Sequence, residues 1–146
     1  MKVEVTLDEN CLETKVIILT KKMTEEITTL MQRLSDHIPQ EIVGFDGDVV
    51  RLLEPADIVR IYAAIGKVFA VIGDKEYILR LRLYEAEERL NGKGFVRISN
   101  SEIINIKKAK KFDLSTVGTI CVSLANGNVS FVSRRYVTKI KKTLGI

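Results

Sequence analysis

The sequence predicts a mainly β protein, built as a sandwich or as stacked small sheets, with a short α+β segment in front. From residue 41 onward, short apolar runs rich in β-branched residues recur, and turn signals such as Asp46-Gly47 and Asn126-Gly127 separate them. Before residue 41, one longer segment carries apolar residues at helical spacing instead. Strands spaced in this way are typical of a sandwich or of stacked small sheets.

The first forty residues are predicted to form an acidic strand–strand–helix unit. Residues 2–7 (KVEVTL) alternate between apolar and polar side chains, and residues 15–20 (KVIILT) are apolar and β-branched, so each segment is typical of a strand. After Thr24, a predicted N-cap, an apolar stripe at spacings of three and four predicts a helix that ends before Pro39. The stripe consists of Ile27, Leu30, Met31 and Leu34. Such a small unit needs a cover for its apolar face.

Residues 41–146 are predicted to contain ten short strands and two helices. The strands are expected at residues 42–45, 49–53, 57–65, 67–72, 76–79, 95–98, 102–106, 110–114, 119–124 and 129–132. Between the fifth and sixth of them, residues 83–90 carry helix-forming side chains at helical spacing, and Asn91-Gly92 ends that helix. A short basic helix is expected over residues 134–144.

The composition is that of one ordinary domain, or of a compact domain with an appendage. The chain has 146 residues and is 46% hydrophobic, which is enough for a core. Its apolar stretches are too short to span a membrane, and the acidic N-terminus lacks the apolar region of a signal peptide. Cys11 and Cys121, outside any CxxC or Cys/His cluster, predict reduced thiols in a cytoplasmic protein and no zinc site; Cys121 is expected in the core.

The sequence does not predict an enzyme. His37 is the only histidine, and we expect it at the end of the first helix. No nucleophile–base pair, metal-ligand set or phosphate-cradling glycine loop is visible. The acidic cluster of Glu85, Glu87 and Glu88 is read as a solvated helix face. We therefore expect no cofactor and no small-molecule substrate.

The positive charge of the chain is concentrated in its last third. Residues 107–146 contain nine Lys or Arg and one acidic residue, Asp113, whereas residues 1–46 contain five Lys or Arg and nine Asp or Glu. A basic end behind an acidic start is typical of a nucleic-acid-binding module with a separate helper segment. A solvated basic face is the alternative interpretation.

Two motifs near the end bear on this choice. In FVRISNSEIIN, residues 95–105, the polar group Ser99-Asn100-Ser101 interrupts apolar anchors. These side chains are explained either as a turn or as readers of base edges, since Asn pairs bidentately with adenine. In SRRYVTKIKK, residues 133–142, Arg134 and Arg135 open the basic helix, and Lys139 continues its charge. The planar fork of Arg suits phosphate and guanine recognition.

FVRISNSEIIN, the Asn126-Gly127 hairpin and VSRRYVTKIKKTL together resemble the LytTR DNA-binding domain of bacterial transcription regulators, over about residues 41–146. The resemblance implies stacked antiparallel sheets whose loops enter successive major grooves of double-stranded DNA. By position it implies contacts from a loop with Gly66 and Lys67, from Ser99, Asn100 and Ser101, and from Arg134 and Arg135. The chain departs from the family pattern at Ser99, where His is frequent, and at Gly66, where a contacting side chain often stands.

Residues 1–40 are too short for the phosphoacceptor receiver domain that many members carry. The segment is instead similar to that of small stand-alone LytTR regulators, which often work with a membrane protein. We expect it to form a homodimer surface or to dock such a membrane-protein regulator. The alternative is that its helix packs on its own two strands. The alternative function for the whole chain is a basic β-module that binds RNA or a protein partner without reading DNA sequence.

Overall fold

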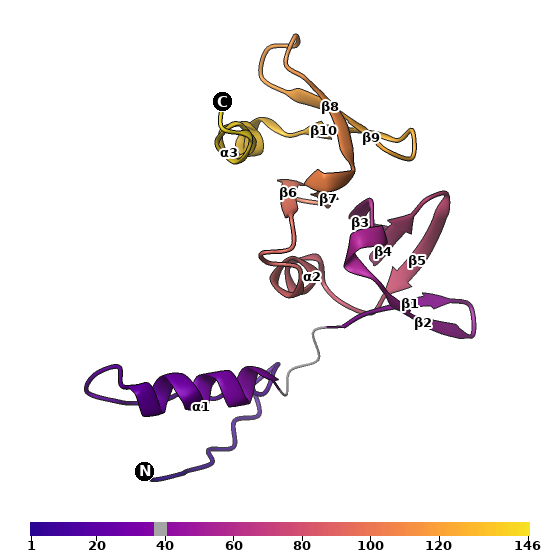
Figure 1. Ribbon diagram of the computed structural model, residues 1–146. Helices are drawn as coiled ribbons and strands as arrows, with labels where there is room; N and C mark the ends of the chain where they lie inside the picture. Colours follow the sequence, from indigo (N-terminus) through magenta and orange to yellow (C-terminus); the bar gives the residue numbers. More distant parts are fainter. Residues whose placement is uncertain (37–40) are drawn as a thin grey trace. The chain divides into compact units, whose positions relative to one another are not determined.

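The computed structural model in Figure 1 describes residues 1–36 and 41–146. The chain divides into two compact units, Met1–Pro39 (unit 1) and Gln40–Ile146 (unit 2), which we describe separately. The predictions for His37 and Pro39 lie outside the described residues. In the part of the chain that the structure describes, no helix has the length and the apolar character needed to cross a membrane.

In unit 1, a single helix forms where a strand–strand–helix unit was predicted. Helix α1 spans Glu25–Asp36, and the backbone N–H of Ile27 donates to Oγ1 of Thr24 at 3.3 Å, which confirms the predicted N-cap. The two predicted strands are wrong: residues 2–7 and 15–20 are unpaired in the structure. Their apolar side chains are exposed, with Val5 at 84% and Ile17 at 68%. The described residues of unit 1 contain no sheet that could receive them, and an isolated strand pair is marginally stable in water.

Unit 2 contains ten strands in two antiparallel sheets, with bounds within a few residues of those predicted. They are β1 (Ile42–Asp46), β2 (Val49–Leu53), β3 (Arg60–Ala64), β4 (Lys67–Ile72), β5 (Lys75–Leu79), β6 (Phe95–Ser99), β7 (Glu102–Asn105), β8 (Ala109–Asp113), β9 (Ile120–Leu124) and β10 (Val129–Val132). The larger sheet has the order β2-β1-β5-β4-β3-β7-β6, and the smaller has the order β10-β9-β8. The fold is therefore mainly β with stacked antiparallel sheets, as predicted.

Two helices complete unit 2. Helix α2 (Leu83–Arg89) follows β5, and the side chain of Glu85 accepts the backbone N–H of Arg82 at 3.1 Å, which closes its first turn. Helix α3 (Arg134–Leu144) has the predicted bounds and ends at Gly145, whose φ of 76° suits a left-handed cap. Glu85 therefore caps α2 rather than only facing solvent.

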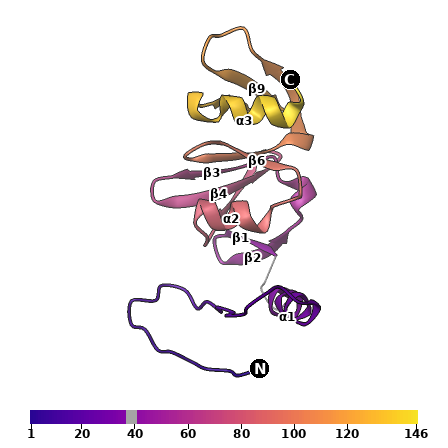
Figure 2. The same cartoon turned by 90° about the vertical axis from the view of Figure 1, so that its left-hand side faces the viewer.

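Unit 2 has two apolar cores, one within the larger sheet and α2, and one between β6–β7 and the smaller sheet. The first gathers Ile42, Ile61, Tyr77, Leu79 and other residues of the larger sheet with Leu83, Ala86 and Leu90 of the α2 region. The second gathers Ile98 and Ile104 of β6 and β7 with residues of the smaller sheet and with Ile140 of α3. Within unit 2, Figure 2 shows α3 and β9 stacked on the layer of β6, β3 and β4, with α2 and β1–β2 farther along the stack.

One predicted strand begins later than expected. Residues 55–57 form a turn of 3₁₀ helix, and β3 starts only at Arg60. Between them, Ile58 enters the first core and Val59 the second, so that both are buried. The buried Asn105 fixes this crossing, since its Nδ2 donates to the carbonyl of Ile58 at 2.9 Å. Cys121 is half-buried on β9, where it alternates with the buried Ile120 and Val122 and belongs to neither core, so its predicted core position is wrong.

Candidate nucleic-acid interface

Three segments that the sequence predicted as DNA contacts lie beside one another at one end of the sheets, which we call the loop end. It consists of the β3–β4 turn (residues 64–67), the β6–β7 turn (residues 99–102) and the first turn of α3. The N–H of Ala63 donates to the carbonyl of Ser101 at 2.8 Å, which ties the first two together. The N–H of Ser133 donates to the carbonyl of Ile98 at 2.9 Å, which ties α3 to β6. The structure thus brings the three predicted segments together.

The β6–β7 turn is shaped by its own serines. Ser99 Oγ accepts the backbone N–H of Ser101 at 3.2 Å, and the two hydroxyl oxygens are 3.4 Å apart. The strand register shifts between Arg97 and Ser99, which pushes the turn out of the sheet. Asn100 and Ser101 are exposed at its tip. The turn explanation for these residues is correct, and it leaves the Asn100 side chain facing solvent.

The side chain of Arg97 binds the backbone of the same turn. Its Nη1 donates to the carbonyl of Asn100 at 2.8 Å and to that of Ser99 at 3.4 Å. Its Nη2 lies 3.4 Å from Oε1 of Glu87, and its side chain is only 13% exposed. A guanidinium that binds two carbonyls of one turn restricts how the turn can move. Glu87, predicted as part of a solvated face, therefore has a structural partner.

The side chain of Asn100 is held from α3. The hydroxyl of Tyr136 donates to Oδ1 of Asn100 at 3.3 Å. With Oδ1 engaged in this way, both protons of the amide nitrogen remain available to an acceptor outside the protein. Tyr136 is itself half-buried and packs against the second core, which fixes the position of its ring. The β6–β7 turn and α3 are therefore one joined surface.

Helix α3 presents two arginines at its start. Arg134 and Arg135 are both exposed, and a Cβ on Gly118 would lie 3.3 Å from Nε of Arg134, so that this guanidinium rests on the β8–β9 loop. The first turn contains no acidic residue. Cations at a helix N-terminus oppose the helix dipole, so this arrangement favours an anionic partner. Ile140, fully buried, anchors the other face of the helix in the core.

Lys67 and Lys139 extend the positive surface. Lys67 is exposed at the start of β4, directly after the β3–β4 turn, and Lys139 is exposed one turn beyond Arg135 on the same face of α3. Among the described residues, no carboxylate lies within 4.0 Å of the cationic group of Lys67, Arg134, Arg135 or Lys139. These charges are thus not used up by internal ion pairs.

Sequence reasoning missed the supporting residues of the loop end. Arg97 and Tyr136 both lie in the sequence motifs, but no contact of either side chain with the turn of Asn100 was predicted. Strand alternation offered one signal for Arg97, because residues 95, 97 and 99 lie on the face opposite the buried Ile98. Nothing in the sequence indicates that Tyr136 reaches Asn100, since the two are separated by 36 positions.

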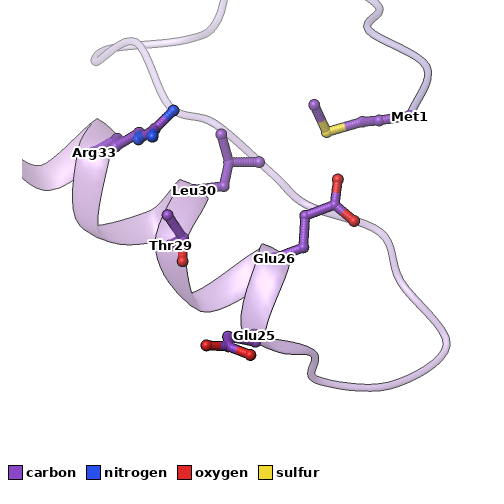
Figure 3. A pocket seen from close by; sticks show the side chains of 6 residues that line it. All are labelled: Met1, Glu25, Glu26, Thr29, Leu30 and Arg33. Carbon is purple, nitrogen blue, oxygen red and sulfur yellow. The ribbon is translucent and has the colours of Figure 1, made fainter.

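Unit 1 has a surface hollow of its own, which Figure 3 shows. It lies between Met1 and one face of α1, and its lining residues are Met1, Glu25, Glu26, Thr29, Leu30 and Arg33. Leu30 points into the hollow between charged side chains of both signs. The hollow is open and carries no set of converging polar groups, and we assign it no ligand.

A mainly β unit with free cations on neighbouring loops is typical of nucleic-acid-binding proteins. The family model of the LytTr DNA-binding domain matches residues 48–145, and the chain therefore belongs to the LytTr DNA-binding domain family of DNA-binding transcription regulators. It is 29% identical over its full length to an uncharacterized HTH-type transcriptional regulator of Staphylococcus aureus strain COL, 99% of which is covered. A similar regulator of strain MRSA252 is 28% identical over the same coverage.

A solved structure agrees in fold. The LytTr DNA-binding domain of a Bacillus cereus protein superposes with a TM-score of 0.69 at 23% identity, over 73% of this chain and 97% of that domain. The relatives are named as HTH-type, yet α2 and α3 are separated by the five strands β6–β10. No two consecutive helices form a helix-turn-helix in the described parts of this chain.

Proposed function

We propose that the protein is a sequence-specific regulator of transcription that reads successive major grooves of double-stranded DNA through its loop end. One observation carries this proposal. Hydrogen bonds join the three segments of the loop end, and their cations have no carboxylate partner among the described residues. In this proposal, Asn100 and Arg135 contact base edges. Lys67, Arg134 and Lys139 contact phosphates, and Ser99 and Ser101 shape the turn that carries Asn100. The protein then acts where the chromosome is, in the cytoplasm of a bacterium.

Fluorescence anisotropy with duplex fragments from upstream of the protein's own gene tests this proposal. Wild type and Asn100→Ala are titrated at several salt concentrations, against each fragment and against a shuffled duplex. We expect one fragment to bind selectively and Asn100→Ala to lose that selectivity. Equal, salt-sensitive binding of every duplex by the wild type would contradict sequence-specific reading.

A single-stranded RNA of the same sequence belongs in the same titration, because one observation favours it. Phe131 of β10 is 63% exposed. An exposed ring is a stacking platform for an unpaired base. Tight binding of the single strand that survives Asn100→Ala and fails in Phe131→Ala would replace the DNA proposal with an RNA-binding role.

We further propose that the protein works as a homodimer and that unit 1 supplies the contact. On α1, Met31 is 46% exposed and Leu34 is 38% exposed, and Ile27 and Leu30 are only half-buried. The extended residues before α1 add further exposed apolar side chains. Exposed apolar surface of this kind marks interaction sites. A membrane-protein regulator is the other candidate for this surface, and a full-length monomer in solution would favour it.

A further inference from the structure

Ile65 has an unusual backbone conformation at the tip of the β3–β4 turn. Its φ is +54°, and it is the single non-glycine residue with positive φ in residues 1–36 and 41–146. Gly66 follows with a φ of +69°, and Ala64 pairs with Lys67, so the hairpin has a two-residue turn. Positive φ at both positions is what a type I′ turn requires, and Asn or Asp normally occupies the first. A β-branched side chain is strained there.

No packing within unit 2 offsets this strain. The Ile65 side chain is 94% exposed, and a Cβ on Gly66 would meet nothing within 4 Å. An isoleucine at this position therefore lowers the stability of the fold through its strained backbone, and it also leaves apolar surface in contact with water. Strained residues that persist without structural benefit are concentrated at functional sites.

The position of Ile65 connects it to the loop end. The hydrogen bond from Ala63 to Ser101 and the pairing of Tyr62 with Glu102 place the β3–β4 tip beside the turn that carries Asn100. Lys67 lies two residues after Ile65 and is exposed, so that it can reach a phosphate. A branched aliphatic side chain therefore projects from the same surface as the proposed base and phosphate contacts.

We propose that Ile65 is a specificity-determining residue that packs against the 5-methyl group of a thymine in the major groove. This inference rests on the proposed function. The major groove presents hydrogen-bonding groups at every base pair, but the thymine methyl is its one apolar feature, and aliphatic side chains recognise it by contact. Ile65 has no polar atom in its side chain and therefore forms no side-chain hydrogen bond with a base. It supplies the side-chain contact that Gly66 lacks.

The experiment first selects preferred duplexes for the full-length wild type from a random-sequence DNA pool. Each thymine of the preferred duplex is then replaced, one at a time, by deoxyuridine, which lacks only the methyl group. Binding of the wild type, Ile65→Gly and Ile65→Asn is measured for every duplex. Leu52→Thr, which alters a 70% exposed side chain on β2, serves as the matched control. Thermal melting of all four proteins is recorded.

At one thymine we expect deoxyuridine to weaken wild-type binding about fourfold, the value of one buried methyl group. Both Ile65 variants should bind the methylated duplex about fourfold more weakly and show no methyl effect at that thymine. They should also melt about 2–6 °C higher than the wild type, because the turn strain is relieved. Leu52→Thr should retain the methyl effect. Binding lost together with lower melting would instead make Ile65 a residue of the fold.

Two further outcomes separate this inference from the proposed function. A preferred duplex that both Ile65 variants bind as tightly as the wild type would overturn the inference alone. Equal methyl effects in wild type and variants at every thymine would do the same. The absence of any preferred duplex would overturn sequence-specific reading, and the role of Ile65 with it.

Discussion

At the residue scale, side chains of the loop end differ in whether they contact DNA or position a neighbour. Tyr136 and Arg97 belong to the second kind, since they bind Asn100 through its amide oxygen and its backbone carbonyl. A positioned amide loses less conformational entropy on binding than a free one. The bonds of Asn100 to the protein therefore affect recognition even though neither partner need touch a base.

Removing the hydroxyl of Tyr136 tests this positioning role. Tyr136→Phe keeps the ring in the second core and deletes only the bond to Asn100. We expect specific duplexes to bind more weakly by about 0.5–1.5 kcal/mol, with non-specific binding and its salt slope unchanged. Tyr84→Phe on α2, where the tyrosine is 50% exposed, is the matched control. If Asn100→Ala and Tyr136→Phe have strictly additive effects on binding, the two side chains are not coupled.

Arg135 and Lys139 lie one turn apart on α3, and we predict different roles for them. Arg135→Ala should cost about 1–3 kcal/mol of specific binding and relax the preference at one base pair. Lys139→Ala should weaken all duplexes alike and reduce the salt slope by about one. Titrations of a specific and a shuffled duplex against salt measure both effects. An Arg135 variant that behaves like the Lys139 variant would place Arg135 on a phosphate.

At the element scale, α3 joins the loop end to the second core. Ile140 is fully buried among residues of the smaller sheet and of β6. Ile140→Ala should lower the free energy of unfolding by about 2–5 kcal/mol and weaken the packing of α3 on the second core. Urea denaturation gives the stability, and anisotropy on a specific duplex gives the binding. Val129→Ala, at a 52% exposed position on β10, should leave both nearly unchanged. Native stability in Ile140→Ala would show that the core does not depend on α3.

The strands of unit 2 were predictable from sequence because each has neighbouring strands that pair with it, and its apolar side chains have a core to enter. Alternation in β9, for example, places Val122 and Leu124 in a core that β10 and α3 complete. Residues 2–7 show the same alternation without any partner strand, and they stay unpaired and exposed. Local pattern thus indicates the capacity to form a strand, while pairing depends on distant residues. For the same reason the loops of the candidate site were predictable, but the Arg97 and Tyr136 contacts across them were not.

At the scale of the whole molecule, the proposed DNA contacts and the proposed dimer contact belong to different units. Unit 2 carries the basic loop end, and unit 1 carries α1 with Met31 and Leu34 exposed. Two copies joined through unit 1 would double the contacts and raise the affinity through a high effective concentration. Dimer formation through unit 1 would therefore strengthen DNA binding without changing the contacts that each copy makes.

Size-exclusion chromatography with light scattering tests this arrangement on the full chain, on residues 41–146 and on Met31→Lys/Leu34→Lys. We expect a dimer for the full chain and monomers for the other two, because both changes remove the apolar surface of α1. Glu25→Lys/Thr29→Lys places two lysines on α1 away from Met31 and Leu34, and it should leave the dimer intact. DNA binding by residues 41–146 should persist with lower affinity, since the loop end is complete without unit 1. A monomeric full chain would sink the dimer and favour a partner protein on α1, whereas a dimer of residues 41–146 would move the contact into unit 2.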